Sequence, residues 1–563
     1  MHSGLLPLTS ASDRVPVAEA VPEVAPEQRG AVYTPDSVAE AMCRWAIRSP
    51  NADMLDPAAG DGVFLRAARR RLAALGASET ECFGVDIDPE AAKQSGALHA
   101  DFFGWHASTD RTFAAVLGNP PYVRSHRFPE TSRRLAFTGM RALGMRPSRL
   151  MSTWAPFVAL AAAHVRPGGR LGLVVPEELL TIAYAKELRH QLRRRFRALT
   201  ICAPPRRLFA SVQQATVLLL ADDSPSCEPG LRVLDYRDLC QSRYDAAQPA
   251  PTWPWTDKWT HLLVPDRERQ QVEELMSRVR WRGLAAYGRV EVGIVTGNNG
   301  YFLLDRRRAD GIRRENRIPV VSRTHQVPGT FFRQDEFDEL VGQDAPMQML
   351  NLQCRPPELD RGESAYVEQG VADGVSGGYK CRNRSPWYAV PSVRRSDAVL
   401  FRQSGRFPRI VHLERPCAVT DTMHRIRWRE GVCGRRVATG FLNVWTLLCT
   451  EFFGRSYGGG VLELMPSEAR NLPVPEPSPE FGELADRVDA MVRNRQFEDV
   501  LALVSEAALP ECAPAERDEL GAILVRLGER RNGHALGNGR PGARPERRSR
   551  RLDATHRGAS QQQ

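Results

Sequence analysis

The tetrapeptide Asn119-Pro120-Pro121-Tyr122 can hold two hydrogen-bond acceptors at a fixed separation. Successive prolines fix the backbone φ angle, so the Asn119 side-chain oxygen and the Pro120 carbonyl oxygen can face the same group. Such a pair suits an exocyclic amine whose lone pair is delocalised into a ring or a carbonyl. Two accepted N–H bonds localise that lone pair and stabilise the positive charge that develops on nitrogen during attack. The tetrapeptide therefore indicates group transfer to a weakly nucleophilic amine, with a methyl sulfonium as a suitable electrophile.

The loop Asp56-Pro57-Ala58-Ala59-Gly60-Asp61-Gly62 follows an apolar strand and precedes a helical pattern. Gly60 and Gly62 let the backbone approach a nucleotide-like ligand where a Cβ would collide. Asp86 ends the next expected strand, where a carboxylate can accept from ribose hydroxyls. Asp88 is expected to cap the helix that follows.

The segment Asp101-Phe102-Phe103 supplies a carboxylate that can accept from an adenine amino group and an aromatic ring that can stack on the base. Phe103 can equally belong to the core. The sequence contains no G-x-x-x-x-G-K-[ST] pattern, so we do not expect a nucleoside triphosphatase.

Short apolar strands and helical patterns alternate around these segments. The strands are expected at 51–55, 82–87, 113–118, 170–175, 198–203 and 215–221, and the helices at 36–48, 62–75, 89–95, 154–165 and 178–196. This alternation predicts a mostly parallel sheet covered by helices.

The composition bounds the class of protein. With 563 residues, 42% hydrophobic and 26% charged, the chain is typical of a soluble globular protein of two or three domains. We find neither a membrane span nor a secretory signal and expect a cytoplasmic protein without a membrane partner. The 11 cysteines form no C-x-x-C pair, so we expect neither a disulfide framework nor a metal site.

Basic residues concentrate in three segments of a chain whose net charge is +10: 124–150, 189–207 and 530–563. Basic blocks on an otherwise acidic chain are typical of a polyanion-binding face. The arginines that end the expected helix 178–196 can also complement its dipole.

Changes in pattern divide the chain into five parts. Residues 1–28 are expected to be a disordered lead, 29–245 the α/β body, 246–480 a second body, 481–529 a helical segment and 530–563 a disordered basic tail.

The motifs and their order resemble those of gamma-class N6-adenine DNA methyltransferases of the TaqI type. The resemblance is close over 30–222, where Tyr33-Thr34-Pro35, Arg166-Pro167-Gly168-Gly169 and 208–215 match further motifs. It implies an α/β fold, in which a Rossmann-like methyltransferase sheet is followed by an α+β DNA target-recognition domain.

The resemblance also implies S-adenosylmethionine as the cofactor. Thr34 would border its methionine part, Asp56 would face its amino group, Asp86 its ribose, and Asp101 with Phe102 its adenine. The family often has glutamate where this chain has Asp86, and the role survives with the shorter side chain.

For the substrate, the resemblance implies an adenine rotated out of double-stranded DNA. Asn119 and Pro120 would hold its N6 amine, and Tyr122 and Phe209 would sandwich the base. Extrusion costs a few kcal/mol, of which stacking recovers about 1 to 3 kcal/mol. The basic segment after the tetrapeptide is well placed to contact phosphates, through Arg124, Arg127, Arg133 and Arg134.

The second body resembles the family's target-recognition domain more loosely, at 293–299, 381–388 and 457–462. Arg382, Asn383 and Arg384 are chemically able to read bases, since arginine pairs with guanine and asparagine with adenine. They can equally contact phosphate or support the fold.

Other functions share part of this pattern. The same tetrapeptide occurs in enzymes that methylate release-factor glutamine or ribosomal RNA guanine, but those resemblances cover a shorter chain. Cytosine N4 methylation uses the same amine chemistry and stays open, whereas cytosine C5 methylation needs a Pro-Cys nucleophile, which here lies at 416–417 in the second body. A non-catalytic DNA-binding protein would not need the cofactor motifs.

A fused nuclease with an acid two residues before a lysine is not expected, because the four lysines have other residues there: Ala91, Tyr184, Thr256 and Gly378. The sequence and the resemblance together predict a site-specific, monomeric adenine methyltransferase. Family context adds protection of host DNA from a separately encoded restriction endonuclease.

Overall fold

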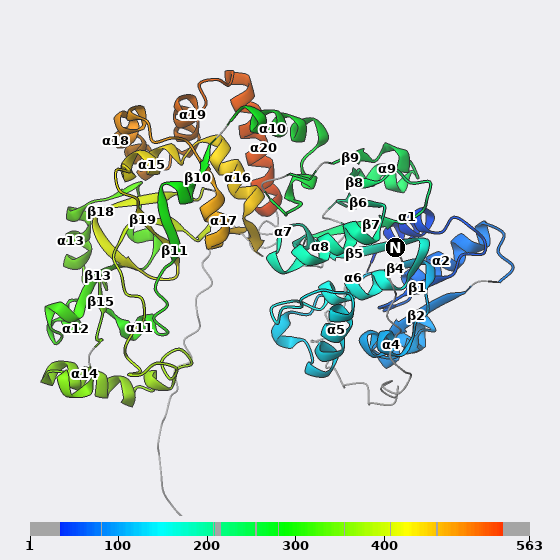
Figure 1. Cartoon of the computed structure of the whole chain (residues 1–563), viewed down its shortest axis with the longest axis horizontal. Helices are drawn as coiled ribbons and strands as arrows, with labels where there is room; N and C mark the ends of the chain where they lie inside the picture. The colour runs from blue at the N-terminus through cyan, green and yellow to red at the C-terminus, as the bar shows by residue number, and fades with distance from the viewer. Residues whose placement is uncertain are drawn as a thin grey trace, which may run out of the picture.

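The structure is a computed structural model, and it describes residues 34–79, 81–205, 208, 215–250, 252–253, 256–279, 281–353, 355–405, 407–457 and 460–532. The expected disordered lead, Phe209 and the expected tail from 533 onward lie outside these residues. Residues 530–532 of that tail instead complete helix α20 (Pro514–Asn532), because Arg530 and Arg531 pair with Glu177 and Glu451. Two bodies, each built on its own sheet, lie side by side with helices α16, α17 and α20 between them (Figure 1).

The first body is built on a nine-stranded sheet with the order β3-β2-β1-β4-β5-β7-β6-β8-β9. Its strands are β1 Met54–Asp56, β2 Cys82–Asp86, β3 Leu98–His99, β4 Phe113–Gly118, β5 Val165–Pro176, β6 Ala198–Cys202, β7 Thr216–Asp222, β8 Gly230–Leu234 and β9 Gln248–Pro249. The first five strands in this order are parallel, while β7 runs antiparallel to both β5 and β6. The expected mostly parallel sheet is confirmed.

Helices cover both faces of this sheet. They are α1 Asp36–Ala46, α2 Val63–Ala74, α3 Pro89–Ser95, α4 Phe102–Ser108, α5 Glu130–Ala142, α6 Trp154–Ala163, α7 Glu178–Thr181, α8 Lys186–Arg195 and α9 Tyr236–Cys240. Val116 packs into one apolar layer, and its neighbours Ala115 and Leu117 pack into the other. This alternation arises because successive side chains of a strand point to opposite faces.

The helix expected at 178–196 is interrupted between α7 and α8. Ile182 has extended backbone angles there, and a short 3-10 turn follows at Ala183–Ala185. The buried Arg189 guanidinium donates to the carbonyl oxygens of Leu179 and Ile182, at 2.8 and 3.2 Å. These bonds satisfy carbonyls that a continuous helix would have paired internally.

The second body carries an eight-stranded sheet in which β11-β19-β16-β18-β13-β15-β12 form one path and β14 pairs with β18. These strands are β11 Gly288–Val292, β12 Leu303–Leu304, β13 Arg317–Val321, β14 Phe331–Phe332, β15 Gln348–Leu350, β16 Ser396–Phe401, β18 Ile410–Val419 and β19 Met423–Trp428. Two smaller sheets pair β10 Arg282–Gly283 with β22 Pro473–Val474, and β21 Val461–Glu463 with β17 Gln403–Ser404 and β20 Arg455–Tyr457.

The helices of the second body confirm its α+β class. They are α10 Asp266–Arg278, α11 Asn299–Phe302, α12 Arg306–Asp310, α13 Gln334–Gly342, α14 Arg361–Ala372, α15 Gly434–Gly440, α16 Val444–Phe453, α17 Pro466–Asn471, α18 Pro479–Arg493, α19 Phe497–Ala508 and α20 Pro514–Asn532. Among the described residues, no helix is both long and apolar enough to cross a membrane.

Two ion pairs, one of them buried, tie the two bodies together. Lys258 Nζ, from the segment that connects the bodies, lies 2.7 Å from Glu468 Oε1 of α17 and also donates to two carbonyl oxygens at the end of α16. Burial lowers the pKa of Lys258 to about 8. At the end of α20, Arg530 lies 2.9 Å from Glu177 of the first body. These ion pairs and hydrogen bonds therefore join the two bodies at a defined junction.

Candidate active site

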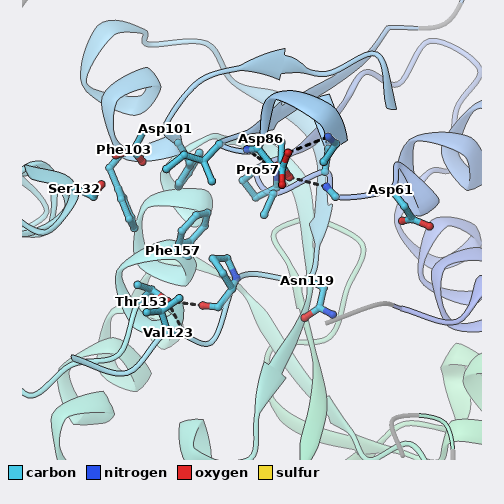
Figure 2. Close-up of a pocket in the computed structure, with 18 of the residues that line it drawn as sticks. Pro57, Asp61, Asp86, Asp101, Phe103, Asn119, Val123, Ser132, Thr153 and Phe157 are labelled. Carbon is cyan, nitrogen blue, oxygen red and sulfur yellow. Dashed lines mark hydrogen bonds between the residues drawn. The ribbon is translucent and has the colours of Figure 1, made fainter. Parts of the chain in front are cut away.

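A cavity of about 340 Å³ opens at the carboxyl ends of β1, β2 and β4 (Figure 2). The strand order reverses between β1 and β4, and ligands of open α/β sheets bind at such a reversal. The lining includes these residues proposed from the sequence: Thr34, Gly60, Asp86, Asp101, Phe102 and Asn119. The structure therefore brings six separate sequence positions to one cavity.

Asp56 lies behind the cavity wall and is fully buried. Its Oδ1 accepts from the Ala58 N–H at 3.1 Å, and its Oδ2 has no hydrogen-bond partner among the described residues. Burial raises the pKa of Asp56 to about 8. A Cβ on Gly118 would lie 2.7 Å from Asp56 Oδ1, so the residue before the tetrapeptide must lack a side chain. A buried carboxyl group with an unsatisfied oxygen is costly unless a ligand supplies a donor.

Asp86 joins the glycine loop to the turn after β2. Its Oδ2 accepts from the Gly60 N–H at 2.7 Å, and its Oδ1 accepts from the Asp88 N–H at 2.8 Å. Asp88 caps α3 by accepting from the Glu90 and Ala91 N–H groups, which confirms the cap expected from the sequence.

The two glycines of the loop differ in what they permit. Both have positive φ, and Gly60 lines the cavity with no atom within 4 Å of an added Cβ. At Gly62, by contrast, a Cβ would lie 2.8 Å from the Cβ of Ser95, and Gly62 is not part of the lining. The close approach that Gly62 permits is thus between the loop and α3, whereas Gly60 is open toward the ligand space.

Asp101 and two phenylalanines close the other end of the cavity. Asp101 caps α4 by accepting from the Phe103 N–H at 3.0 Å, and burial raises the pKa of its carboxyl group. Phe102 stacks on Phe157 with ring centroids 4.8 Å apart, and Phe103 meets the same ring edge-on at 4.7 Å. Phe102 and Phe103 therefore belong to the core and also line the cavity.

Two hydrogen bonds fix the side chain of Asn119. Its Nδ2 donates to Thr34 Oγ1 at 3.0 Å, and its Oδ1 accepts from the Tyr122 hydroxyl at 2.8 Å. Because a hydroxyl group meets each end of the amide, the two hydrogen bonds hold the side chain in place. Burial raises the pKa of Tyr122 well above its usual value, so the hydroxyl keeps its proton and remains a donor.

Tyr122 is half-buried and does not line the cavity. Its hydroxyl also lies 3.1 Å from the Val174 carbonyl oxygen, so the single proton is shared between this oxygen and Asn119 Oδ1, and the ring is anchored to β5. The structure therefore gives Tyr122 a positioning contact with Asn119, a contact that the sequence did not predict.

Several lining residues were missed by sequence reasoning, and three of them lie on or beside α5 and α6. Ser132 comes from α5, Phe157 comes from α6, and Thr153 directly precedes α6. The Thr153 hydroxyl donates to the Pro121 carbonyl oxygen and accepts from the Val123 N–H, so it braces the tetrapeptide on both sides (Figure 2). No local pattern marks these residues, because they reach the cavity only through the packing of α5 and α6 on the sheet.

The residues proposed to contact DNA fall into two groups. Arg124, Arg127, Arg134 and Arg382 are exposed. The others have partners within the protein: Arg133 pairs with Glu130, Asn383 donates to the Tyr379 carbonyl oxygen, and Arg384 donates to the carbonyl oxygens of Val295 and Thr296. Arg384 therefore supports the 293–299 loop.

Comparison with known proteins gives two family matches. Residues 20–246 match the N-6 DNA Methylase family, and residues 256–509 match the C-terminal domain of Type II methyltransferase M.Eco57I.

Two relatives match over most of their length. Type II methyltransferase M.AccI of Acinetobacter calcoaceticus is 20% identical over 474 residues, which are 77% of this chain and 83% of the relative. Type II methyltransferase M.XamI of Xanthomonas campestris pv. amaranthicola is 22% identical over 471 residues, 79% of this chain and 85% of the relative. A solved structure of the type IIG restriction endonuclease BpuSI aligns with 16% identity and a TM-score of 0.38, over 90% of this chain and 67% of that chain.

Proposed function

We propose that this chain, a DNA methyltransferase of the restriction–modification type, transfers a methyl group from S-adenosylmethionine to N6 of an adenine rotated out of double-stranded DNA. The observation that carries the proposal is the Asn119 amide, which Thr34 and Tyr122 hold in one orientation beside the cavity. A fixed acceptor at the carboxyl end of β4 is what an exocyclic amine requires.

The residues around the cavity fit the cofactor. The resemblance assigns Asp56 to its ammonium group; Asp56 lies behind the cavity wall, next to the lining residues Pro57 and Ala58, and its Oδ2 has no partner among the described residues. A cation there would favour the charged carboxylate. Asp86 and Gly60 would bind the ribose end, and Asp101 with the two neighbouring phenylalanines would bind the adenine end. When bound, the cofactor would supply an electrophilic methyl group on a sulfonium.

The chain itself would orient and polarise the amine. Asn119 Oδ1 and the Pro120 carbonyl oxygen would be the two acceptors; Asn119 lines the cavity, whereas Pro120 is buried and is not part of the lining. Holding both N6 hydrogens would turn the nitrogen lone pair toward the methyl group and stabilise the charge that develops on it.

Further parts of the proposal rest on the resemblance. They are the gamma class of the TaqI type, a monomeric cytoplasmic protein, stacking of the target base between Tyr122 and Phe209, and protection of host DNA from a separately encoded endonuclease. The order of the motifs along residues 33–222 supports the class.

Transfer of labelled methyl groups to DNA tests the function. Asn119→Ala should abolish transfer while calorimetry shows unchanged cofactor binding, because Asn119 would contact the amine and not the cofactor. Retained transfer would overturn the catalytic role. Mass spectrometry of digested DNA should find N6-methyladenine, and N4-methylcytosine instead would overturn the choice of base.

A further inference from the structure

Seven arginines and one glutamate line a cavity of about 520 Å³ on the second body, which we call the arginine basin. The charged residues are Arg289, Glu291, Arg394, Arg395, Arg425, Arg427, Arg429 and Arg470. They come from β11, the segment before β16, β19 and its end, and α17. None of the three basic segments that stand out in the sequence contributes to the basin.

Strand register concentrates the positive charge. In the antiparallel pair β11–β19, Glu291 lies opposite Arg425 and Arg289 lies opposite Arg427. The first pair is neutral, with 3.0 Å between Arg425 Nη2 and Glu291 Oε2. The second pair sets two cations against each other, and like charges directly opposite destabilise a sheet.

Glu291 cannot neutralise the rest of the basin. It already pairs with both Arg425 and Arg289, the latter at 2.6 Å. Arg429 and Arg470 donate to backbone carbonyl oxygens, at 3.1 Å each, which orients their guanidinium groups without cancelling their charge.

Three more arginines of the basin face solvent. Arg394, Arg395 and Arg427 are exposed and make no hydrogen bond or ion pair with other described residues. The alternating residues of the same strands, such as Val290 and Ile426, are buried in the core. The basin is therefore the outer face of the sheet edge, and its charge is not required for packing.

The basin begins beside the junction of the two bodies. Arg470 belongs to α17, whose Glu468 pairs with Lys258 at that junction. Arg470 also donates to Val290 of β11, and α17 lies beside β11 between the two sheets (Figure 1).

We propose that the arginine basin binds the sugar–phosphate backbone of the target duplex. This inference rests on the proposed function and adds the surface of the second body that grips its substrate. Guanidinium groups match phosphate oxygens in geometry and keep their charge. Bound phosphates would supply the anions that Glu291 alone cannot, and would relieve the repulsion between Arg289 and Arg427.

The variants Arg427→Gln and Arg395→Gln of the full chain test the basin, with Arg487→Gln as a matched control. Arg487 is an exposed arginine on α18 without a partner among the described residues. Affinity for a duplex that the protein methylates should be measured across a range of salt concentrations. A variant that no longer binds one of the phosphates should show a slope of log K against log salt that is flatter by about 0.9.

The thermal midpoint without DNA provides the second measurement. Arg427→Gln removes a like-charge pair, so its midpoint should equal or exceed that of the wild type while its DNA affinity falls. A merely structural role would lower the midpoint instead. At saturating DNA the methylation rate should be unchanged, since the basin does not touch the cavity.

The outcomes separate the two proposals. If the wild type methylates DNA and both basin variants keep the wild-type salt slope, the basin inference is wrong and the proposed function stands. If the wild type methylates no DNA at all, the proposed function itself fails.

Discussion

The cavity of the first body and the arginine basin of the second body achieve binding in opposite ways. The cavity is lined largely by short continuous motifs that follow β1, β2 and β4, and its key polar groups are partly buried and held by internal hydrogen bonds. The basin collects exposed arginines from four distant segments and leaves several unpaired among the described residues. Chemistry on one atom requires fixed geometry, whereas gripping a polyanion requires mainly charge.

The largest effect on binding is expected for a substitution in the first body, at Asp56. Asp56→Asn should weaken cofactor binding by roughly 30-fold or more, because truncating one side of a buried charge pair typically costs about 2 to 5 kcal/mol. Wild-type affinity should rise with pH between about 6 and 7.5, since the carboxyl group, whose pKa is about 8, must lose its proton to pair with an ammonium. The variant should lose this dependence in calorimetric titrations, and a variant that binds normally would contradict the assignment.

The same substitution has a consequence for stability without ligand. Burial raises the pKa of Asp56 from 3.8 to about 8, so its contribution to stability is full below about pH 4 and is lost as the pH rises toward 8. Asp56→Asn should therefore show a flatter decline of the free energy of unfolding with pH over that range. Denaturant titrations at several pH values measure it.

The second largest effect is expected at the junction that holds the two regions together. Lys258→Met removes a buried cation from Glu468 and should lower the free energy of unfolding by about 3 kcal/mol, since breaking a buried pair leaves a charge uncompensated. Arg455 remains near Glu468 in the variant and still compensates part of its charge. The loss of stability should therefore lie near the lower end of the values typical for a broken buried pair. If the junction also fixes the orientation of the bodies, KM for DNA should rise while cofactor affinity stays constant.

A smaller effect is expected at Tyr122. Tyr122→Phe keeps the ring but removes the hydroxyl that donates to Asn119, so kcat should fall about tenfold, equivalent to about 1.4 kcal/mol. Cofactor affinity should not change. Thr34→Val is the companion variant, because it removes the hydrogen bond at the other end of the same amide. An unchanged kcat in both variants would show that catalysis does not depend on the hydrogen bonds that hold Asn119.

The smallest effects should separate two neighbouring arginines. Arg382→Gln should reduce DNA affinity a few-fold and leave the thermal midpoint unchanged, because the side chain is exposed. Arg384→Gln should lower the midpoint instead, because it removes two hydrogen bonds to the 293–299 loop, each of the charged type worth about 1.5 to 3 kcal/mol. The reverse pattern would mean that Arg384 contacts DNA.

Much of the first body could be predicted from local patterns. Strands and helices appear close to the expected ranges, because apolar alternation and helical periodicity report which side of each element is buried. The break in the expected helix 178–196 could not be predicted, since it depends on the Arg189 guanidinium reaching carbonyls of the preceding turns. The lining residues Ser132, Thr153 and Phe157 were missed for a similar reason.

The sequence by itself determined the alternation of elements, the glycine loop, the acid at the end of β2 and the tetrapeptide after β4, since each is a property of adjacent residues. Only the tertiary structure decided that Tyr122 orients Asn119, that Asp56 has an oxygen unsatisfied by the described residues, and that Arg289 faces Arg427. The physical reason is that burial and strand register are set by packing between segments far apart in the chain, and no local pattern encodes them.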